Sequence, residues 1–137
     1  MAGINDPGEI ARALKTARTI AVVGCSPKDN RPSHAIASYL LSAGFDVIPV
    51  NPGHTEILGR MCYPDLGSIP ADVRLDIVDV FRRSEFVSGI ADAALERGVG
   101  FFWMQDGIVD KSAANRLAAA GIPVAMDRCI YRDHSAH

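Results

Sequence analysis

Polar and apolar residues follow a repeated order along this chain: a helical pattern, a single glycine, and then a short apolar run. The order occurs three times, with the glycines at Gly44, Gly98 and Gly121. A glycine directly after a helix is typical of a C-terminal cap in the left-handed conformation. The apolar run after each glycine predicts a strand. These strands are expected at residues 45–50, 99–104 and 122–126.

Two further apolar runs predict strands at residues 20–23 and 75–81. In the second of these runs, Asp76 and Asp79 interrupt the apolar positions, so we expect one face to be less completely buried. The two carboxylates are interpreted as solvated or edge residues and not as an acid–base pair. Helices are expected at about residues 7–18, 32–43 and 87–95.

Strands that alternate with single helices imply right-handed crossovers and a parallel sheet covered on both sides. The predicted fold class is α/β: a Rossmann-like, doubly wound, mainly parallel five-stranded sheet with helices on both faces. The chain has 137 residues, of which 48% are hydrophobic. We expect one domain over residues 1–137, with its core at about 19–130.

The charge balance argues against general binding to nucleic acid or to acidic membrane lipids. The formal net charge is -2, so there is no basic surplus. No apolar stretch approaches the length of a membrane span, and the first residues do not resemble a secretory signal. We therefore expect a cytoplasmic protein in which Cys25, Cys62 and Cys129 are reduced thiols.

Ligands of doubly wound sheets bind outside the carboxyl ends of the strands, near the point where the strand order reverses. The strongest candidate is the turn at Gly24, which is followed by Lys28, Arg31 and the start of a helix. The helix would aim unpaired N–H groups at the turn, and the two cations would add charge for a pyrophosphate. Ser33 is expected either to cap this helix or to contact the ligand.

Two departures from the dinucleotide-binding pattern weigh against NAD. Cys25 and Ser26 follow the turn glycine, so the sequence lacks G-x-G-x-x-G. The second strand leads into Asn51, where NAD-binding domains usually place an acidic residue. The pattern leaves open a different nucleotide with a diphosphate and a further phosphate, which Arg82 or Arg83 would neutralise.

Five short motifs lie at the ends of the predicted strands. They are Val22-Val23-Gly24-x-Ser26 with Arg31-Pro32-Ser33, Ile48-Pro49-Val50-Asn51-Pro52, Asp79-Val80-Phe81-Arg82-Arg83-Ser84-Glu85, Trp103-Met104-Gln105-x-Gly107 and Met126-Asp127-Arg128-Cys129. In this order they resemble the small stand-alone CoA-binding proteins, whose fold is similar to the CoA-binding domain of the succinyl-CoA synthetase α subunit. The resemblance covers about residues 20–129, and five ordered motifs are more specific than any single one.

The resemblance implies a bound coenzyme A, or an acyl-CoA, whose diphosphate lies over residues 24–26 and the following helix start. The adenosine would lie near residues 50–52 and 80–82, and Gln105 and Gly107 would face the crevice. The residues expected to bind the coenzyme are Gly24, Cys25, Ser26, Lys28, Arg31, Ser33, Val50, Asn51, Pro52, Val80, Phe81, Arg82, Gln105 and Gly107. The chain departs from the family pattern at residues 130–134, and a frayed tail is expected after Tyr131.

The leading hypothesis is a non-catalytic or regulatory CoA-binding module. His34, His54, His134 and His137 show no pairing with a nucleophile or carboxylate, so no catalytic residue is predicted. No metal site is predicted, because no paired Cys/His spacing is present. The alternatives are an NAD(P)-dependent oxidoreductase, a CoA-ligase component that requires a partner chain, and an interaction domain with an empty crevice. A homodimer and an unidentified protein partner are both left open.

The reactivity of Cys25 has two interpretations. A thiol beside a helix N-terminus and cations would have a lowered pKa, whereas a thiol that only fills the turn would be inert. The reactive interpretation gives the hypothesis that Cys25 or Cys129 forms a mixed disulfide with CoA under oxidation.

Overall fold

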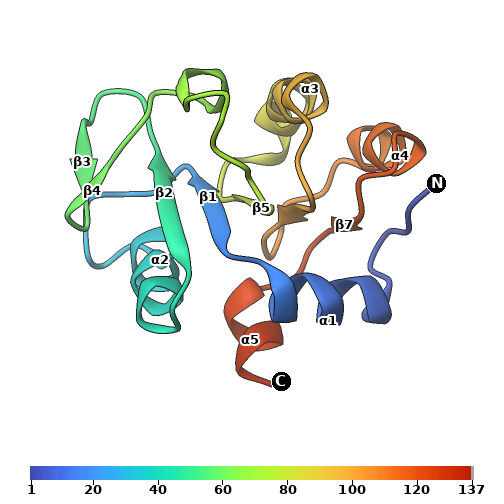
Figure 1. Cartoon of the computed structure of the whole chain (residues 1–137), viewed down its shortest axis with the longest axis horizontal. Helices are drawn as coiled ribbons and strands as arrows, with labels where there is room; N and C mark the ends of the chain where they lie inside the picture. The colour runs from blue at the N-terminus through green and yellow to red at the C-terminus, as the bar shows by residue number, and fades with distance from the viewer. Residues whose placement is uncertain (137) are drawn as a thin grey trace.

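The computed structural model describes residues 1–136, and His137 lies outside the described residues (Figure 1). The helices are α1 (Pro7–Thr16), α2 (Pro32–Ser42), α3 (Val87–Arg97), α4 (Lys111–Ala119) and α5 (Ile130–Ser135). The strands are β1 (Thr19–Val23), β2 (Asp46–Val50), β3 (Glu56–Ile57), β4 (Arg60–Met61), β5 (Ile77–Val80), β6 (Phe102–Met104) and β7 (Val124–Ala125). Short 3-10 turns, η1 (Leu66–Ser68) and η2 (Ser84–Phe86), lie before β5 and α3.

The main sheet of residues 1–136 has five parallel strands in the order β2-β1-β5-β6-β7. From β1 the chain moves outward to β2, and from β5 it moves outward in the opposite direction to β6 and β7. The strand order therefore reverses between β1 and β5, which makes this junction the switch point of the sheet. The predicted Rossmann-like, doubly wound α/β fold is confirmed.

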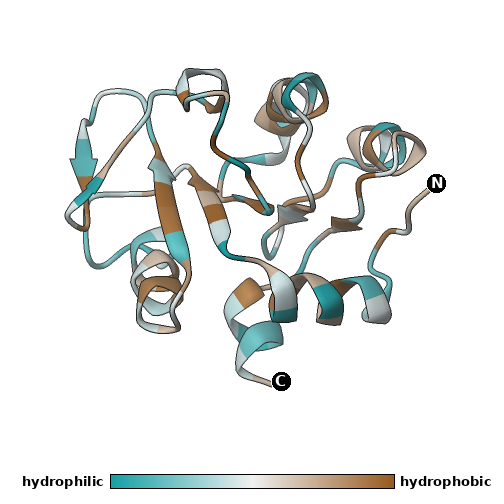
Figure 2. Cartoon of the chain, viewed as in Figure 1, coloured by the Kyte–Doolittle hydropathy of each residue, from teal (hydrophilic) through white to brown (hydrophobic). Residues whose placement is uncertain are grey.

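Helices cover both faces of the sheet, and each face has its own apolar cluster (Figure 1). Helices α3 and α4 pack on one face, where side chains such as Val78 and Met104 are buried. Helices α1, α2 and α5 pack on the other face, which contains Ile77 and Trp103. Alternate residues of β5 and β6 thus point to opposite faces, as the two-residue repeat of a strand requires. Hydrophobic colouring gathers on β1 and β2 in Figure 2.

The helix ends follow the chemistry that the sequence predicts. The Asp6 carboxylate accepts the N–H of Glu9 at 2.9 Å and caps α1, and Pro7 occupies the first turn. Gly44, Gly98 and Gly121 have φ angles of 98°, 79° and 88° after α2, α3 and α4. These values lie in the left-handed region, where glycine is favoured because it has no Cβ atom.

Strands β3 and β4 and helix α5 were not predicted. Strands β3 and β4 form a short antiparallel hairpin after β2, and Tyr63 then bridges back to Val50 in parallel. The expected frayed tail after Tyr131 is wrong, because residues 130–135 form α5. Helix α5 is held by bidentate contacts of Arg132 with Asp106, at 2.7 Å each.

The expectation for residues 75–81 is also wrong in one respect. All four residues of β5 are buried, because β5 lies in the middle of the sheet with helices on both sides. Asp79 is fully buried, whereas Asp76 precedes the strand and accepts the backbone N–H groups of Arg18 and Thr19. The two carboxylates therefore occupy different environments, and neither lies on an edge strand.

Candidate functional site

Two cavities meet at Gly24, directly after β1 and at the switch point of the sheet. We call the first the α3 cavity, with a volume of about 300 Å³. It is lined by Val23, Gly24, Val50, Pro52, Pro64, Asp65, Leu66, Arg82, Phe86, Gly89, Ile90 and Ala93. The second, the α2 cavity, has a volume of about 680 Å³. It is lined by Gly24, Ser26, Arg31, Pro32, Ser33, Ile36, Phe81, Gln105, Asp106, Ile108 and Cys129.

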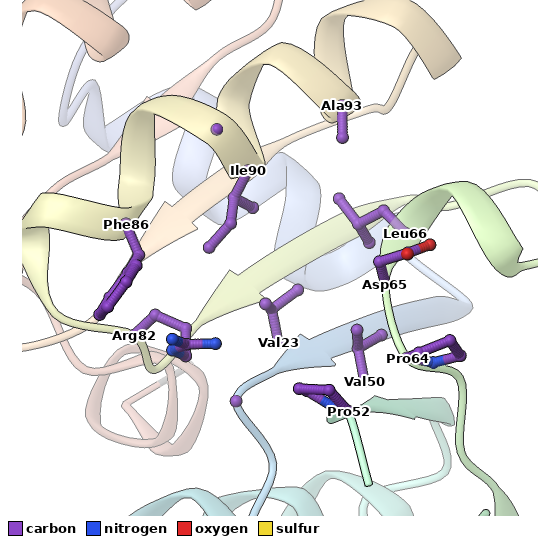
Figure 3. Close-up of a pocket in the computed structure, with 12 residues that line it drawn as sticks. Val23, Val50, Pro52, Pro64, Asp65, Leu66, Arg82, Phe86, Ile90 and Ala93 are labelled. Carbon is purple, nitrogen blue, oxygen red and sulfur yellow. The ribbon is translucent and has the colours of Figure 1, made fainter.

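The walls of the α3 cavity are mostly apolar. Figure 3 shows Val23 and Val50 at the strand ends, with Pro52 and Pro64 to one side and Phe86 to the other. One face of α3 also lines the cavity, because its contributing residues recur at helical spacing. An apolar hollow of this kind suits a flat ring system, which gains binding energy mainly from shape and burial.

Gly24 is required by the backbone at the junction of the two cavities. Its φ angle is 85°, and a Cβ atom built there would lie 3.0 Å from the carbonyl oxygen of Phe81 and 3.0 Å from Cδ of Arg82. Any side chain at this position would therefore be strained and would push against β5 and Arg82. The atoms that leave no room for a side chain at Gly24 thus belong to Phe81 and Arg82 of the protein.

The backbone N–H groups of the turn are already used within the protein. Those of Gly24 and Cys25 both donate to the carbonyl of Val50, at 2.8 and 3.3 Å, and extend the pairing of β1 with β2. The N–H of Ser26 donates to Oγ of Ser33 at 2.9 Å. The amides of residues 24–26 are therefore not free to receive the diphosphate that the sequence predicts over this turn. Ser33 holds the turn and does not cap α2, whose N-cap is Arg31.

The donors left for an anion come from the start of α2 and from side chains. Pro32 has no N–H, and the N–H groups of His34 and Ala35 both donate to the carbonyl of Arg31 at 3.1 Å. Within residues 1–136, the N–H of Ser33 is the first-turn amide of α2 without a partner. The start of α2 therefore offers an anion one backbone N–H, that of Ser33, and not the several unpaired N–H groups that the sequence predicts.

Three cations surround the same turn. Lys28, Arg31 and Arg82 form no ion pair within the described residues 1–136. The guanidinium carbon of Arg82 lies 4.2 Å from the ring centroid of Phe86, which holds the arginine at the wall of the α3 cavity. Arg83 lies farther from the ring, at 5.5 Å, and pairs with Glu85.

Most of the residues predicted to bind the coenzyme line one of the two cavities. They are Gly24, Ser26, Arg31, Ser33, Val50, Pro52, Phe81, Arg82 and Gln105. The other predicted residues lie beside the cavities without lining them. They are Cys25, Lys28, Asn51, Val80 and Gly107.

The bonds of these outlying residues explain their positions. The Asn51 amide donates to the carbonyl of Cys25 at 2.8 Å, so it supports the turn from below. The N–H of Gly107 donates to the Asp127 carboxylate at 2.6 Å, and Val80 is fully buried in β5. Asn51 and Gly107 therefore shape the loops around the cavities.

Sequence reasoning missed one whole wall of the α3 cavity. The parallel bridge between Val50 and Tyr63 brings Pro64, Asp65 and Leu66 beside the end of β2. The wall formed by α3 and the residue before it was also not predicted, although Phe86, Gly89, Ile90 and Ala93 follow a helical spacing in the sequence. Asp65 places an acidic side chain near the end of β2. No acidic side chain was expected at this position, because the residue directly after β2 is Asn51.

The interpretation of Cys25 as a reactive thiol is wrong. Cys25 is fully buried, and this burial, together with the nearby Cys62 and Asp79, raises the pKa of its thiol to about 12. A thiol with this pKa carries almost no thiolate at neutral pH. Cys129 lines the α2 cavity, and its reaction with CoA stays a prediction.

Gln105 is a buried polar residue that lines the α2 cavity. It follows β6 directly and is only 4% exposed. Its Oε1 accepts the N–H of Ile130 at 3.1 Å, so the opposite end of the amide is its donor end. This is the one buried amide side chain among residues 1–136 that lines a cavity.

Residues 1–136 form a doubly wound sheet with two cavities that share Gly24 and with free cations at the switch point, the place where α/β proteins of this type bind ligands. The family described as CoA binding domain matches residues 18–135 of this chain. The chain belongs to this CoA-binding domain family, which confirms the resemblance seen in its motifs.

Three proteins illustrate what this chain is similar to. The chain is 41% identical over 127 residues to the uncharacterized protein YneT of Bacillus subtilis, and the match covers 93% of both chains. A hypothetical protein from Pyrococcus horikoshii OT3 has a similar solved structure, with a TM-score of 0.90 and 33% identity, over 96% of this chain and 91% of that one. A 63-residue stretch, 46% of this chain, is 38% identical to the ADP-forming acetate–CoA ligase I of Archaeoglobus fulgidus, of which it covers 9%.

Residues 1–136 contain neither a metal-ligand cluster nor a membrane-spanning helix. No group of three or more His, Cys, Asp or Glu side chains there is placed to hold a metal ion. No helix in the same residues is long and apolar enough to cross a membrane.

Proposed function

We propose that this protein binds coenzyme A across the switch point as a non-catalytic or regulatory module. The adenosine lies in the α3 cavity, the diphosphate lies at the junction beside Gly24, and the pantetheine arm extends into the α2 cavity. Family membership supports the identity of the ligand, and the two cavities support this orientation.

The observation that carries the proposal is that Gly24 lines both cavities. A long ligand with a ring at one end and a flexible arm at the other fills both hollows only by passing this residue. The cations lie at the same crossing, with Arg82 in one cavity and Arg31 in the other. Their charges suit a diphosphate, because guanidinium groups bind phosphate oxygens in pairs.

The non-catalytic part of the proposal rests on the cavity walls. Within residues 1–136, no histidine lines either cavity. Cys129 is the sole thiol that lines them, and Asp106, a carboxylate in the same cavity, is already paired with Arg132. A binding or reporting role therefore fits the two cavities better than a bond-making step.

One observation favours NAD as a second candidate. Asp65 lines the α3 cavity and has one carboxylate oxygen that bonds to Ser68, which leaves the other for a ribose hydroxyl. Against this candidate, Arg82 lines the same cavity and attracts a phosphorylated ribose, as CoA and NADP have. The choice between these nucleotides is therefore a direct experimental question.

Thermal unfolding with CoA, NAD, NADP and ATP separates these candidates. A ligand at about one hundred times its Kd adds roughly 2.7 kcal/mol of stability, which is readily detected in a domain of this size. We expect CoA to raise the Tm most. Stabilisation by NAD or NADP alone would favour the oxidoreductase, and no response to any ligand would favour an interaction domain.

A pair of variants locates the binding site. Arg31→Ala removes a cation at the junction and should lower the Tm shift with CoA. Arg12→Ala is the matched control, because Arg12 is an exposed arginine of α1 that lines a separate hollow with Asp76. Equal CoA responses from the two variants would contradict the placement of the diphosphate.

A further inference from the structure

The side-chain amide of Gln105 has a donor that no acceptor of residues 1–136 uses. Its side chain is 4% exposed, and the Nε2 group forms no hydrogen bond within residues 1–136. Gln105 lines the α2 cavity, so this N–H pair faces the space where a ligand would enter. A polar donor of a side chain this deeply placed, with no acceptor in the protein, is left for a ligand or water in the cavity.

The orientation of this amide is fixed. The N–H of Ile130 is a donor, and so the atom that it meets at 3.1 Å must be the amide oxygen. Ile130 begins α5, and α5 is anchored through the contacts of Arg132 with Asp106 and of Arg128 with Asp133. The Nε2 group therefore cannot turn away from the cavity without breaking the bond to Ile130.

The surroundings of Gln105 limit which acceptor would suit it. Ile36, Phe81 and Ile108 give the α2 cavity an apolar wall. Asp106 lies at the same cavity, and its charge is matched by Arg132 at 2.7 Å. Apart from the N–H of Ser33, which the diphosphate would use, the cavity thus offers the donor of Gln105 beside apolar surface. This arrangement fits an uncharged acceptor oxygen followed by a short aliphatic group.

We propose that the α2 cavity selects an acyl thioester of CoA over the free thiol, with Gln105 Nε2 donating to the thioester carbonyl oxygen. This inference rests on the proposed function. The acyl group is short and aliphatic, and it packs against the apolar wall. Free CoA ends in a thiol, which is a weak acceptor, so it leaves the donor of Gln105 poorly satisfied.

Pantetheine also contains two amide carbonyls, and either would be an acceptor for the same donor. The two arrangements differ in one measurable respect. If Gln105 donates to the thioester carbonyl, the protein binds acyl-CoA more tightly than CoA. If Gln105 donates to a pantetheine amide carbonyl, the affinities for both ligands rise equally. A ligand series therefore separates them without any change to the protein.

The test is isothermal titration of the wild-type protein with CoA, acetyl-CoA and S-ethyl-CoA. S-ethyl-CoA is the matched control, because a CH₂ group replaces the carbonyl and the chain length is unchanged. We expect acetyl-CoA to bind about tenfold more tightly than S-ethyl-CoA, the size of one hydrogen bond. In Gln105→Met the two affinities should become equal.

Each other outcome overturns a stated part of the account. Equal binding of the three ligands by the wild type would refute the selection of thioesters while leaving CoA binding intact. An equal loss of affinity for all three ligands in Gln105→Met would show that Gln105 donates to a pantetheine amide carbonyl and not to the thioester. No binding of any CoA compound would refute the proposed function itself. If Gln105→Met does not fold, the ratio of the wild-type affinities for acetyl-CoA and S-ethyl-CoA is enough to test the selection of thioesters.

Discussion

The two cavities that meet at Gly24 differ in the chemistry of the sheet face beneath them. Within residues 1–136 the buried polar or charged side chains are Ser33, Asp79 and Gln105. Ser33 and Gln105 line the α2 cavity, and Asp79 shares its face of β5 with Ile77, on the side of the sheet where α1, α2 and α5 pack. The α3 side has an apolar core instead.

This contrast indicates two ways of recognising one ligand. The α3 cavity offers shape and apolar area, which suit a ring but distinguish polar groups poorly. The α2 side carries buried polar groups, which discriminate between ligands because an unmatched donor is costly. Asp79, whose buried oxygens have no partner within residues 1–136, reduces the stability of that side of the sheet. We therefore expect the α2 side to respond to pH and to the chemistry of the ligand, and the α3 side to respond to volume.

The largest expected effect concerns Asp79. Neither of its carboxylate oxygens has a hydrogen-bond partner in the described residues, and burial raises its pKa well above the usual value. The folded protein thus keeps a proton that the unfolded chain loses above about pH 3.9. Stability should fall as pH rises from there toward the folded pKa, by at most about 1.4 kcal/mol per pH unit. Urea unfolding between pH 5 and 8 measures this slope, and Asp79→Asn should flatten it.

Asp76 provides the opposite case for comparison. Burial raises its pKa, but hydrogen bonds from the N–H groups of Thr19 and Arg18 and from Arg74 outweigh this effect, and the pKa is lowered. The stability that Asp76 contributes is present above the pKa of the unfolded carboxyl and is lost as pH falls through the folded pKa. Asp76→Asn should therefore leave the slope above pH 5 unchanged. A flattened slope in this variant would contradict the assignment to Asp79.

The second prediction tests the junction itself. Gly24→Ala should lower the free energy of unfolding by about 2–3 kcal/mol, because it combines a positive φ with the contact at Phe81. Gly53→Ala is the control: its φ is 94°, but a Cβ atom there meets nothing within 4 Å, so about 1 kcal/mol is expected. Chemical denaturation of both variants provides the comparison. Equal losses would show that the close approach at Gly24 has no energetic consequence.

The structure explains why the fold was predictable and the use of the turn was not. The glycines after α2, α3 and α4 are local signals, since each reports the φ of its own residue. The N–H groups of Gly24 and Cys25, by contrast, meet Val50, which lies on another strand and about 25 residues away in the sequence. Strand pairing therefore decides which N–H groups stay free for a ligand. The local sequence pattern around Gly24 gives no information on that pairing.

Other errors have the same non-local cause. The wall at residues 64–66 reaches the α3 cavity through the bridge between Tyr63 and Val50, which no local motif signals. Asp79 was misinterpreted because alternating acids in a run usually mark an exposed face, whereas β5 is enclosed by neighbours on both sides. The cavity residues of β1, β2 and α2 were found because strand ends and a helix start identify them locally.

The third prediction concerns the cations of the α3 side. Arg82→Ala should weaken CoA binding about tenfold, the size expected for one lost charge-assisted contact. Arg83→Ala is a close control, because its side chain is 79% exposed and already pairs with Glu85. Titration calorimetry should show little change in this control. Similar losses in the two variants would mean that overall charge, and not the position of Arg82, decides the affinity.

The smallest effect should come from Gly89, a glycine inside α3 that lines the α3 cavity. A Cβ atom at this position meets nothing within 4 Å. Gly89→Ala should raise the stability by up to about 1 kcal/mol through helix propensity and reduce CoA affinity a few-fold, because its methyl group enters the cavity. Thermal unfolding and calorimetry measure the two changes. A variant that is more stable and binds CoA more tightly would contradict the volume-based role of the α3 side.

A crystal structure of the complex with CoA tests the central claim most directly. The account predicts adenine against Phe86 and Pro52 in the α3 cavity, a diphosphate between Arg82 and the N–H of Ser33, and the pantetheine arm beside Gln105. A coenzyme that lies wholly in one cavity, or that binds away from the Gly24 junction, would contradict it.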